Sequence, residues 1–237
     1  MLTELTRMGL PKSRRSVRHI GLKTDPTAPP GELGGLHSKV HWFDACRPTS
    51  PAGFPSVGAR GCFLSHLGCL THALEQGHGR VLVLEDDLMV NGELLHDQAG
   101  VVEQLESTPW DMVYLGHALS VPRVAPTMLV PFDDPVMLAH FYGVSEPCIQ
   151  RLVTFLQKVL ARPPGHPDGG PMHVDGAFST FRSQNSSVRT LVAHPSLGGT
   201  RSTRSDIHAG KLDKIAALRA PMGVLRAAKR IIQRFRT

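Results

Sequence analysis

The sequence has no long hydrophobic run. None of its apolar stretches approaches the ~20 residues that a membrane-spanning helix needs. The first ten residues, MLTELTRMGL, lack the uninterrupted apolar core of a signal peptide. The four cysteines are too few for a disulfide scaffold and show no close metal-type pairing. We therefore expect a cytoplasmic protein in a reducing compartment.

The composition is that of an ordinary globular protein. Hydrophobic residues make up 41% of the 237 residues and charged residues 19%, which argues against wholesale disorder. The length suits one domain with an appendage and suffices to bury a core.

The net charge of +6 is spread unevenly along the chain. Residues 1–23 carry +5, residues 24–210 carry −6 and residues 211–237 carry +7. A basic protein suggests a nucleic acid or an anionic membrane as partner. A nucleic-acid-binding face should itself be basic. The acidic middle and the lack of a recognisable motif therefore argue against a nucleic-acid partner.

The basic C-terminal segment has a helical pattern. A charge run also fits a solvated tail, but apolar residues recur here at helical spacing with basic residues between them: Val224, Leu225, Ala228, Ile231, Ile232 and Phe235. This pattern is typical of helices that lie on anionic lipid. We expect residues 211–237 to be a basic amphipathic tail that holds the protein peripherally at the inner face of the membrane.

Periodic apolar residues predict strands alternating with helices. We expect strands near 39–43, 81–84, 110–115, 136–144 and 188–193, and helices over 62–77, 98–107 and 145–160. The continuous run VLVL at 81–84 indicates a buried parallel strand, and Ser145 has the chemistry of a helix N-cap. Cys62 and Cys69, seven residues apart, fit core packing. The alternation predicts an α/β layered domain.

Three acidic residues, Glu85-Asp86-Asp87, follow the strand at 81–84 without a spacer. In open α/β sheets, ligands bind beyond the carboxyl ends of the strands. Adjacent carboxylates repel one another, and a divalent cation is the usual partner that stabilises them. Hard oxygen ligands suit Mg²⁺ or Mn²⁺. Taken alone, the triplet also fits a solvated strand-to-loop turn with acids at a helix N-cap.

The surroundings of the triplet resemble a known family. The chain reads G-C-F-L-S-H-L at 61–67 and V-L-V-L-E-D-D at 81–87. This order is similar to glycosyltransferase family 25, the lipooligosaccharide-biosynthesis and collagen-galactosyltransferase group. Looser matches follow in order, at 140–160, at P-M-H-V-D-G-A (171–177) and at S-D-I (205–207). The resemblance covers roughly residues 55–208.

The resemblance implies a GT-A-like (Rossmann-like) nucleotide-sugar transferase. The donor would be UDP-galactose or UDP-glucose, and the reaction would invert the sugar's configuration. A divalent ion, Mn²⁺ or Mg²⁺, would stabilise the charge that grows on the leaving nucleoside diphosphate. The family pattern makes Asp87 the direct metal ligand, with Asp86 and Glu85 supporting the metal or the ribose.

Five further residues are candidates for the site. Asp175 could remove the acceptor's proton as a general base, orient the acceptor, or serve only as a turn or helix-cap residue. Ser65 and His66 fit either the donor site or a buried, hydrogen-bonded helix position. His194 matches the place of the last metal ligand in many GT-A enzymes, or is a plain strand-end histidine. Asp206 fits donor contact or local capping.

One feature departs from the family. Members begin with a strand of the type I-N-L-D-R that receives the nucleotide base, whereas Met1 here falls inside the helix that should follow it. We expect the glycosyltransferase domain over 1–210 to lack that strand.

Two functions remain open. The first is a metal-dependent hexosyltransferase that acts on a glycan or lipid-linked saccharide acceptor in lipooligosaccharide or surface-glycan synthesis. The second is a catalytically degraded family member that serves as a glycan- or protein-binding module. The missing strand supports the second function, and the intact acidic triplet opposes it.

Overall fold

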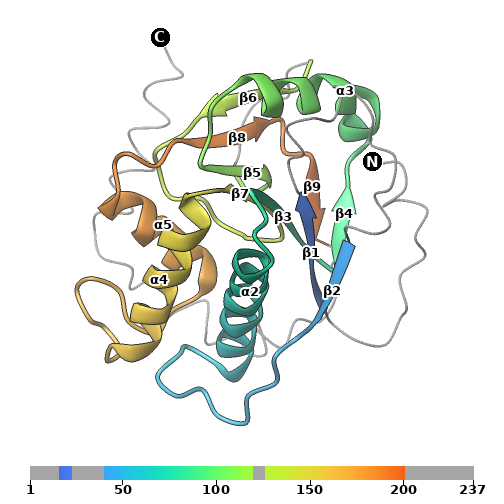
Figure 1. The fold of residues 1–237 in the computed structure, drawn as a ribbon. Coiled ribbons are helices and arrows are strands. Elements are labelled where there is room, and N and C mark those ends of the chain that lie inside the picture. Colours follow the sequence, from blue (N-terminus) through green and yellow to red (C-terminus); the bar gives the residue numbers. More distant parts are fainter. Residues whose placement is uncertain (1–15, 23–39, 120–125, 201–237) are drawn as a thin grey trace. The chain divides into compact units, whose positions relative to one another are not determined.

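The computed structural model describes residues 16–22, 40–119 and 126–200 (Figure 1). Seven strands form one mixed sheet in the order β2-β1-β3-β7-β5-β8-β6. Their bounds are β1 Ser16–Leu22, β2 Val40–Asp44, β3 Arg80–Glu85, β5 Met112–Gly116, β6 Met128–Pro131, β7 Phe141–Ser145 and β8 Thr190–His194. Two short strands, β4 Leu88–Val90 and β9 Gly198–Thr200, pair separately. The expected α/β class is confirmed for the described part of the chain.

Within the described ranges, four helices cover the sheet: α2 Val57–Glu75, α3 Gly92–Ser107, α4 Cys148–Ala161 and α5 Val174–Gln184. Figure 1 shows α2, α4 and α5 together on one side of the sheet. β3 supplies side chains to cores on both faces. Val81 and Val83 pack under these three helices, whereas Leu82 and Leu84 share the second core with Leu94 of α3. The continuous apolar run of β3 is therefore explained by burial on both faces.

The prediction that residues 81–84 form a parallel strand is wrong in the pairing direction. β3 pairs antiparallel with β1 on one side and with β7 on the other. Among the described strands, only β5 and β8 pair parallel. An apolar run reports that both faces of a strand are covered, and it carries no information on the direction of the neighbouring strands.

Local signals set the ends of α2. The side chain of Ser56 accepts a hydrogen bond from the backbone N–H of Ala59 at 3.0 Å, so the helix begins five residues before the predicted Cys62. Gly77 follows the helix with φ of +65°, a conformation that glycine adopts without strain. Its role in ending the helix is confirmed.

Other boundaries differ from the sequence prediction. Ser145 is the last residue of β7 and donates to the carbonyl of Trp110 at 2.7 Å, so it does not cap α4. The N-cap of α4 is Pro147. Residues 136–140 are not a strand, and β1 and α5 are elements that the sequence pattern does not predict. Among the described residues, no helix has both the length and the apolar character needed to span a membrane.

Candidate functional site

The acidic triplet lies at the carboxyl end of β3. Glu85 is the last residue of the strand, and Asp86 and Asp87 form the turn that leads into β4. All three residues are half-buried, and the Glu85 side chain is 25% exposed. The turn thus presents carboxylates at the carboxyl end of β3.

Two residues of the G-C-x-x-S-H sequence hold the preceding loop against α2. A side chain at Gly61 would place its Cβ 2.7 Å from the carbonyl oxygen of Cys46, so only glycine permits this approach. The buried Ser65 hydroxyl accepts from the backbone N–H of Cys46 at 2.8 Å and donates to the carbonyl of Gly61 at 2.7 Å. These contacts support a structural role for Ser65, and donor contact stays a prediction.

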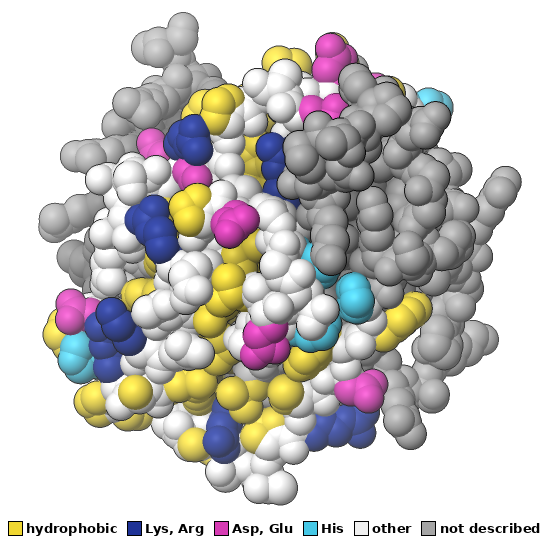
Figure 2. All heavy atoms as spheres, in the orientation of Figure 1, with side chains coloured by type: hydrophobic (Ala, Val, Ile, Leu, Met, Phe, Trp, Pro, Cys, Tyr) yellow, Lys and Arg dark blue, Asp and Glu magenta, His cyan; other side chains and the backbone are white. Residues whose placement is uncertain are grey.

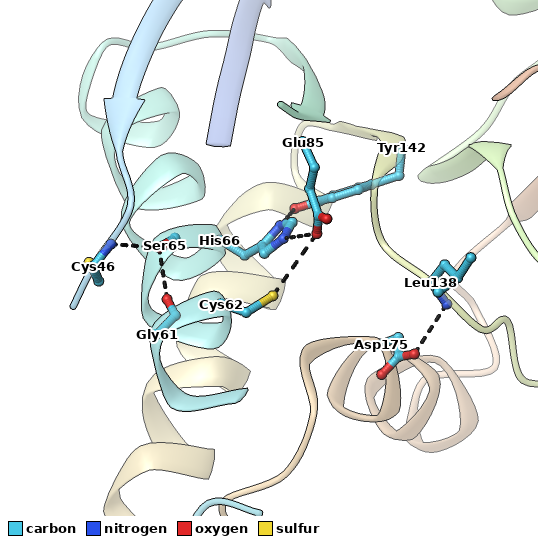
Figure 3. A network of polar contacts seen from close by, with 9 residues as sticks. All are labelled: Cys46, Gly61, Cys62, Ser65, His66, Glu85, Leu138, Tyr142 and Asp175. Atoms are coloured by element: carbon cyan, nitrogen blue, oxygen red, sulfur yellow. Dashed lines mark hydrogen bonds and ion pairs between the residues drawn. The ribbon is translucent and has the colours of Figure 1, made fainter. Parts of the chain in front are cut away.

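The other two residues of this sequence, Cys62 and His66, face the acidic turn (Figure 3). His66 is fully buried, and its Nε2 lies 3.1 Å from Oε1 of Glu85. Since an ionised carboxylate only accepts hydrogen bonds, Nε2 carries the proton in this pair. On the other side of the ring, Nδ1 forms a hydrogen bond with the Tyr142 hydroxyl, 3.0 Å away. His66 therefore contributes to the site by holding the Glu85 carboxylate in place.

The Tyr142 hydroxyl keeps its proton at any ordinary pH. Burial is the largest cause that raises the pKa of its hydroxyl well above the usual range, and nearby groups, among them Cys69, Tyr114 and Glu85, raise it further. The residue is fully buried on β7, between β3 and β5 in the sheet. Its hydroxyl fixes the orientation of the His66 ring, and the ring in turn fixes Glu85.

The expected core packing is confirmed for Cys69, and Cys62 packs at the edge of the same core. Cys69 is completely buried among apolar side chains, but Cys62 is half-buried with its Sγ 4.0 Å from Oε1 of Glu85. Burial raises the pKa of the Cys62 thiol well above its usual range, and the charges of Glu85, Asp175 and Asp87 add to this. The charges of three carboxylates therefore act on the Cys62 thiol. The i, i+4 spacing of Cys62 and His66 on one helix face is the sequence signal that could have indicated that both side chains face Glu85.

Asp175 lies in the first turn of α5, which faces the same region in Figure 3. Its Oδ1 accepts from the backbone N–H of Gly176 at 2.8 Å, and its Oδ2 accepts from that of Leu138 at 3.1 Å. Leu138 has φ of +73°, a left-handed conformation that costs a non-glycine residue about 1–2 kcal/mol. Asp175 thus supports a strained loop while it stands near the acidic turn.

The structure brings some predicted site residues together and leaves others apart. The pKa of one thiol, that of Cys62, is raised by the charges of three predicted site residues: Glu85, Asp87 and Asp175. His194 ends β8 at the same end of the sheet as Glu85, with β7 and β5 between the two strands. Its role as a metal ligand stays a prediction. Asp206 lies outside the described residues.

Comparison with known proteins gives one partial likeness. No family model matches the chain. A segment of 62 residues, 25% of this chain, is 34% identical to a Bos taurus protein named "Probable inactive glycosyltransferase 25 family member 3". The matched segment spans 10% of that protein's length. Part of the chain is therefore similar to a protein named as a glycosyltransferase 25 family member, and the activity of the whole chain is a matter for proposal.

Proposed function

We propose that the protein is a GT-A-like glycosyltransferase that moves galactose or glucose from a UDP-sugar to a glycan or lipid-linked saccharide in lipooligosaccharide or surface-glycan synthesis. The single observation that carries this proposal is that Glu85, at the acidic turn after β3, and Asp175, on α5, lie in the same region as Cys62 (Figure 3), and the charges of both raise the pKa of its thiol. A transferase needs groups that hold a metal ion at the donor's diphosphate, and it needs a base that removes the proton of the acceptor hydroxyl. These two kinds of group come from elements far apart in the chain.

The residues have separate roles in the proposed reaction. Asp87 and Asp86 would hold Mn²⁺ or Mg²⁺, with His194 as a further ligand, and the hard carboxylate oxygens of the turn fit these ions. Bound there, the ion stabilises negative charge on the leaving UDP. Glu85 and Asp206 would contact the donor.

Asp175 would accept the proton of the acceptor hydroxyl as that oxygen attacks the sugar's anomeric carbon. The bond from this carbon to the diphosphate oxygen breaks on the opposite side, so the configuration inverts. Asp175 is half-buried in the first turn of α5. A charged carboxylate is the form that a general base requires.

The function is tested by incubating the wild-type protein with UDP-galactose or UDP-glucose and measuring UDP release with Mn²⁺ or Mg²⁺. We expect many turnovers per protein molecule, which stop when EDTA removes the ion and resume when it is restored. The proposal fails if neither turnover nor metal-dependent UDP binding occurs with either ion.

A non-catalytic module is the second candidate, favoured by the word "inactive" in the name of the similar bovine protein. Such a module would bind a glycan or a protein and release no UDP. Glycan binding that is unaffected by EDTA, without any turnover, would support this candidate over the first.

Membrane association is a separate part of the proposal and concerns residues 211–237, which lie outside the described residues. Their net charge of +7 favours anionic lipid. We expect the full chain to co-sediment with phosphatidylglycerol vesicles at moderate salt, and deletion of residues 222–237 to release it. Vesicles of phosphatidylcholine are the control. Unchanged binding after the deletion would contradict this part.

No nucleic-acid partner is proposed. Figure 2 shows Lys and Arg side chains scattered singly among acidic and apolar ones on the face in view. A nucleic-acid site needs basic residues gathered on one face.

A further inference from the structure

We propose that Cys62, His66 and Glu85 form a binding site for a divalent metal ion of the zinc class, distinct from the carboxylates Asp86 and Asp87. One ligand atom of each of the three residues lies within 4.8 Å of the others. The inference goes beyond the proposed function and does not depend on sugar transfer.

The distances in this cluster suit a tetrahedral ion. With Zn–S near 2.3 Å and Zn–N and Zn–O bonds of about 2.0–2.2 Å, tetrahedral ligand atoms stand about 3.4–3.6 Å apart. The structure places Nε2 of His66 3.1 Å from Oε1 of Glu85, and Sγ of Cys62 4.0 Å from the same oxygen. Shifts of well under 1 Å in each side chain would bring these two separations to the tetrahedral value.

The backbone holds the three ligands on two regular elements. Cys62 and His66 are four residues apart on α2 and so project from one face of the helix. Glu85 ends β3, whose residues Val81–Leu84 are buried. Ligands fixed on a helix and a strand lose little conformational freedom when they bind an ion.

Tyr142 gives the histidine the support that metal-binding histidines usually have. A histidine that binds a metal through Nε2 typically donates its Nδ1–H to an oxygen, which fixes the ring. The Tyr142 hydroxyl lies 3.0 Å from Nδ1 and can rotate its hydrogen away to become the acceptor. This second observation is independent of the cluster itself and points to Nε2 as the ligand atom.

The donor set selects the class of metal. A thiolate with an imidazole and a carboxylate favours zinc-like ions over Mg²⁺ and Ca²⁺, which prefer oxygen alone. On binding, the S–H bond of Cys62 breaks, its proton passes to solvent, and the electron pair left on Sγ forms the bond to the ion. The proton on Nε2 of His66 moves to Nδ1 through solvent exchange. No atom changes oxidation state, and three protein ligands leave the fourth position to water.

The test uses Co²⁺ as a spectroscopic probe, because a cobalt–thiolate bond absorbs in the near ultraviolet and cobalt bound only by oxygen and nitrogen does not. We expect this band on titration of the metal-free full-length protein, and its loss when stoichiometric Zn²⁺ is added. Excess Mg²⁺ should leave the band unchanged, since it competes only at Asp86 and Asp87.

Variants separate this site from other ligands. Cys62→Ser should abolish the band, whereas Cys46→Ser, which removes another half-buried thiol outside the cluster, should keep it. Tyr142→Phe should weaken Zn²⁺ affinity by about 10–100-fold. Circular dichroism checks that each variant is folded.

Two outcomes would overturn the inference: a folded wild-type protein without the band, or a band that survives in Cys62→Ser. Neither outcome bears on UDP release, so the two proposals fail independently.

Discussion

Asp87→Ala is expected to remove most metal-dependent UDP release, with a fall in kcat/KM of about 10³-fold. The variant loses the residue proposed as the direct ligand of the ion that stabilises the leaving diphosphate. A loss of this size corresponds to about 4 kcal/mol of transition-state stabilisation, the upper value for removal of one preorganised charge-stabilising group. The measurement is initial UDP release across a range of Mn²⁺ concentrations.

The matched control is Asp168→Ala, which removes an exposed carboxylate whose charge pairs weakly with Arg162 at 3.9 Å. Its activity should equal that of the wild type, because exposed ion pairs contribute little. A folded Asp87→Ala protein that turns over at the wild-type rate would refute the metal-ligand role of Asp87.

Asp175→Asn is expected to lower kcat by about 10²–10⁴-fold while the KM for the donor changes little. The asparagine oxygen can still accept the hydrogen bond from the backbone of Leu138, so the loop keeps its support. The variant loses the ability to take a proton and, because its NH2 group cannot accept, the hydrogen bond from the backbone N–H of Gly176. Steady-state kinetics with saturating acceptor measure the two parameters separately.

The structure also provides the experiment that would contradict a base role. If Asp175 serves only to hold Leu138, then Asp175→Asn should keep full activity and Asp175→Ala should lose it. In that case Leu138→Gly, which removes the strain at φ of +73°, should restore activity to Asp175→Ala. A general base would give the opposite pattern, with both Asp175 variants inactive and no rescue.

The sequence predicts the acidic turn well because its signals are local. Four consecutive β-forming residues, Val81–Leu84, indicate a buried strand wherever they lie, and Glu85 must then stand at its end. The helix that contains the G-C-x-x-S-H sequence is also determined by local signals, because Ser56 is its N-cap and Gly77 follows its last turn. These two elements carry most of the candidate site.

The sequence does not predict which groups meet across elements. In the sequence, Tyr142 looks like any aromatic residue of a predicted strand. In the structure, the pairing of β7 with β3 brings its hydroxyl to His66. The helix α5 has few apolar positions at its start, so residues 171–177 look like a polar loop. Because the packing of α5 depends on long-range contacts, the place of Asp175 beside Leu138 follows from the fold alone.

The position of β7 between β3 and β5 has a consequence for the growing chain on the ribosome. β3 is synthesised before α3 and β5, and its β7 neighbour comes only after both. Until then, one edge of a strongly apolar strand has no partner, which is a hazard for aggregation. Arg80 precedes the apolar run and Glu85, Asp86 and Asp87 follow it. Charges that flank such a strand act as gatekeepers against edge-to-edge association. The carboxylates proposed to serve the finished site thus also protect the unfinished sheet.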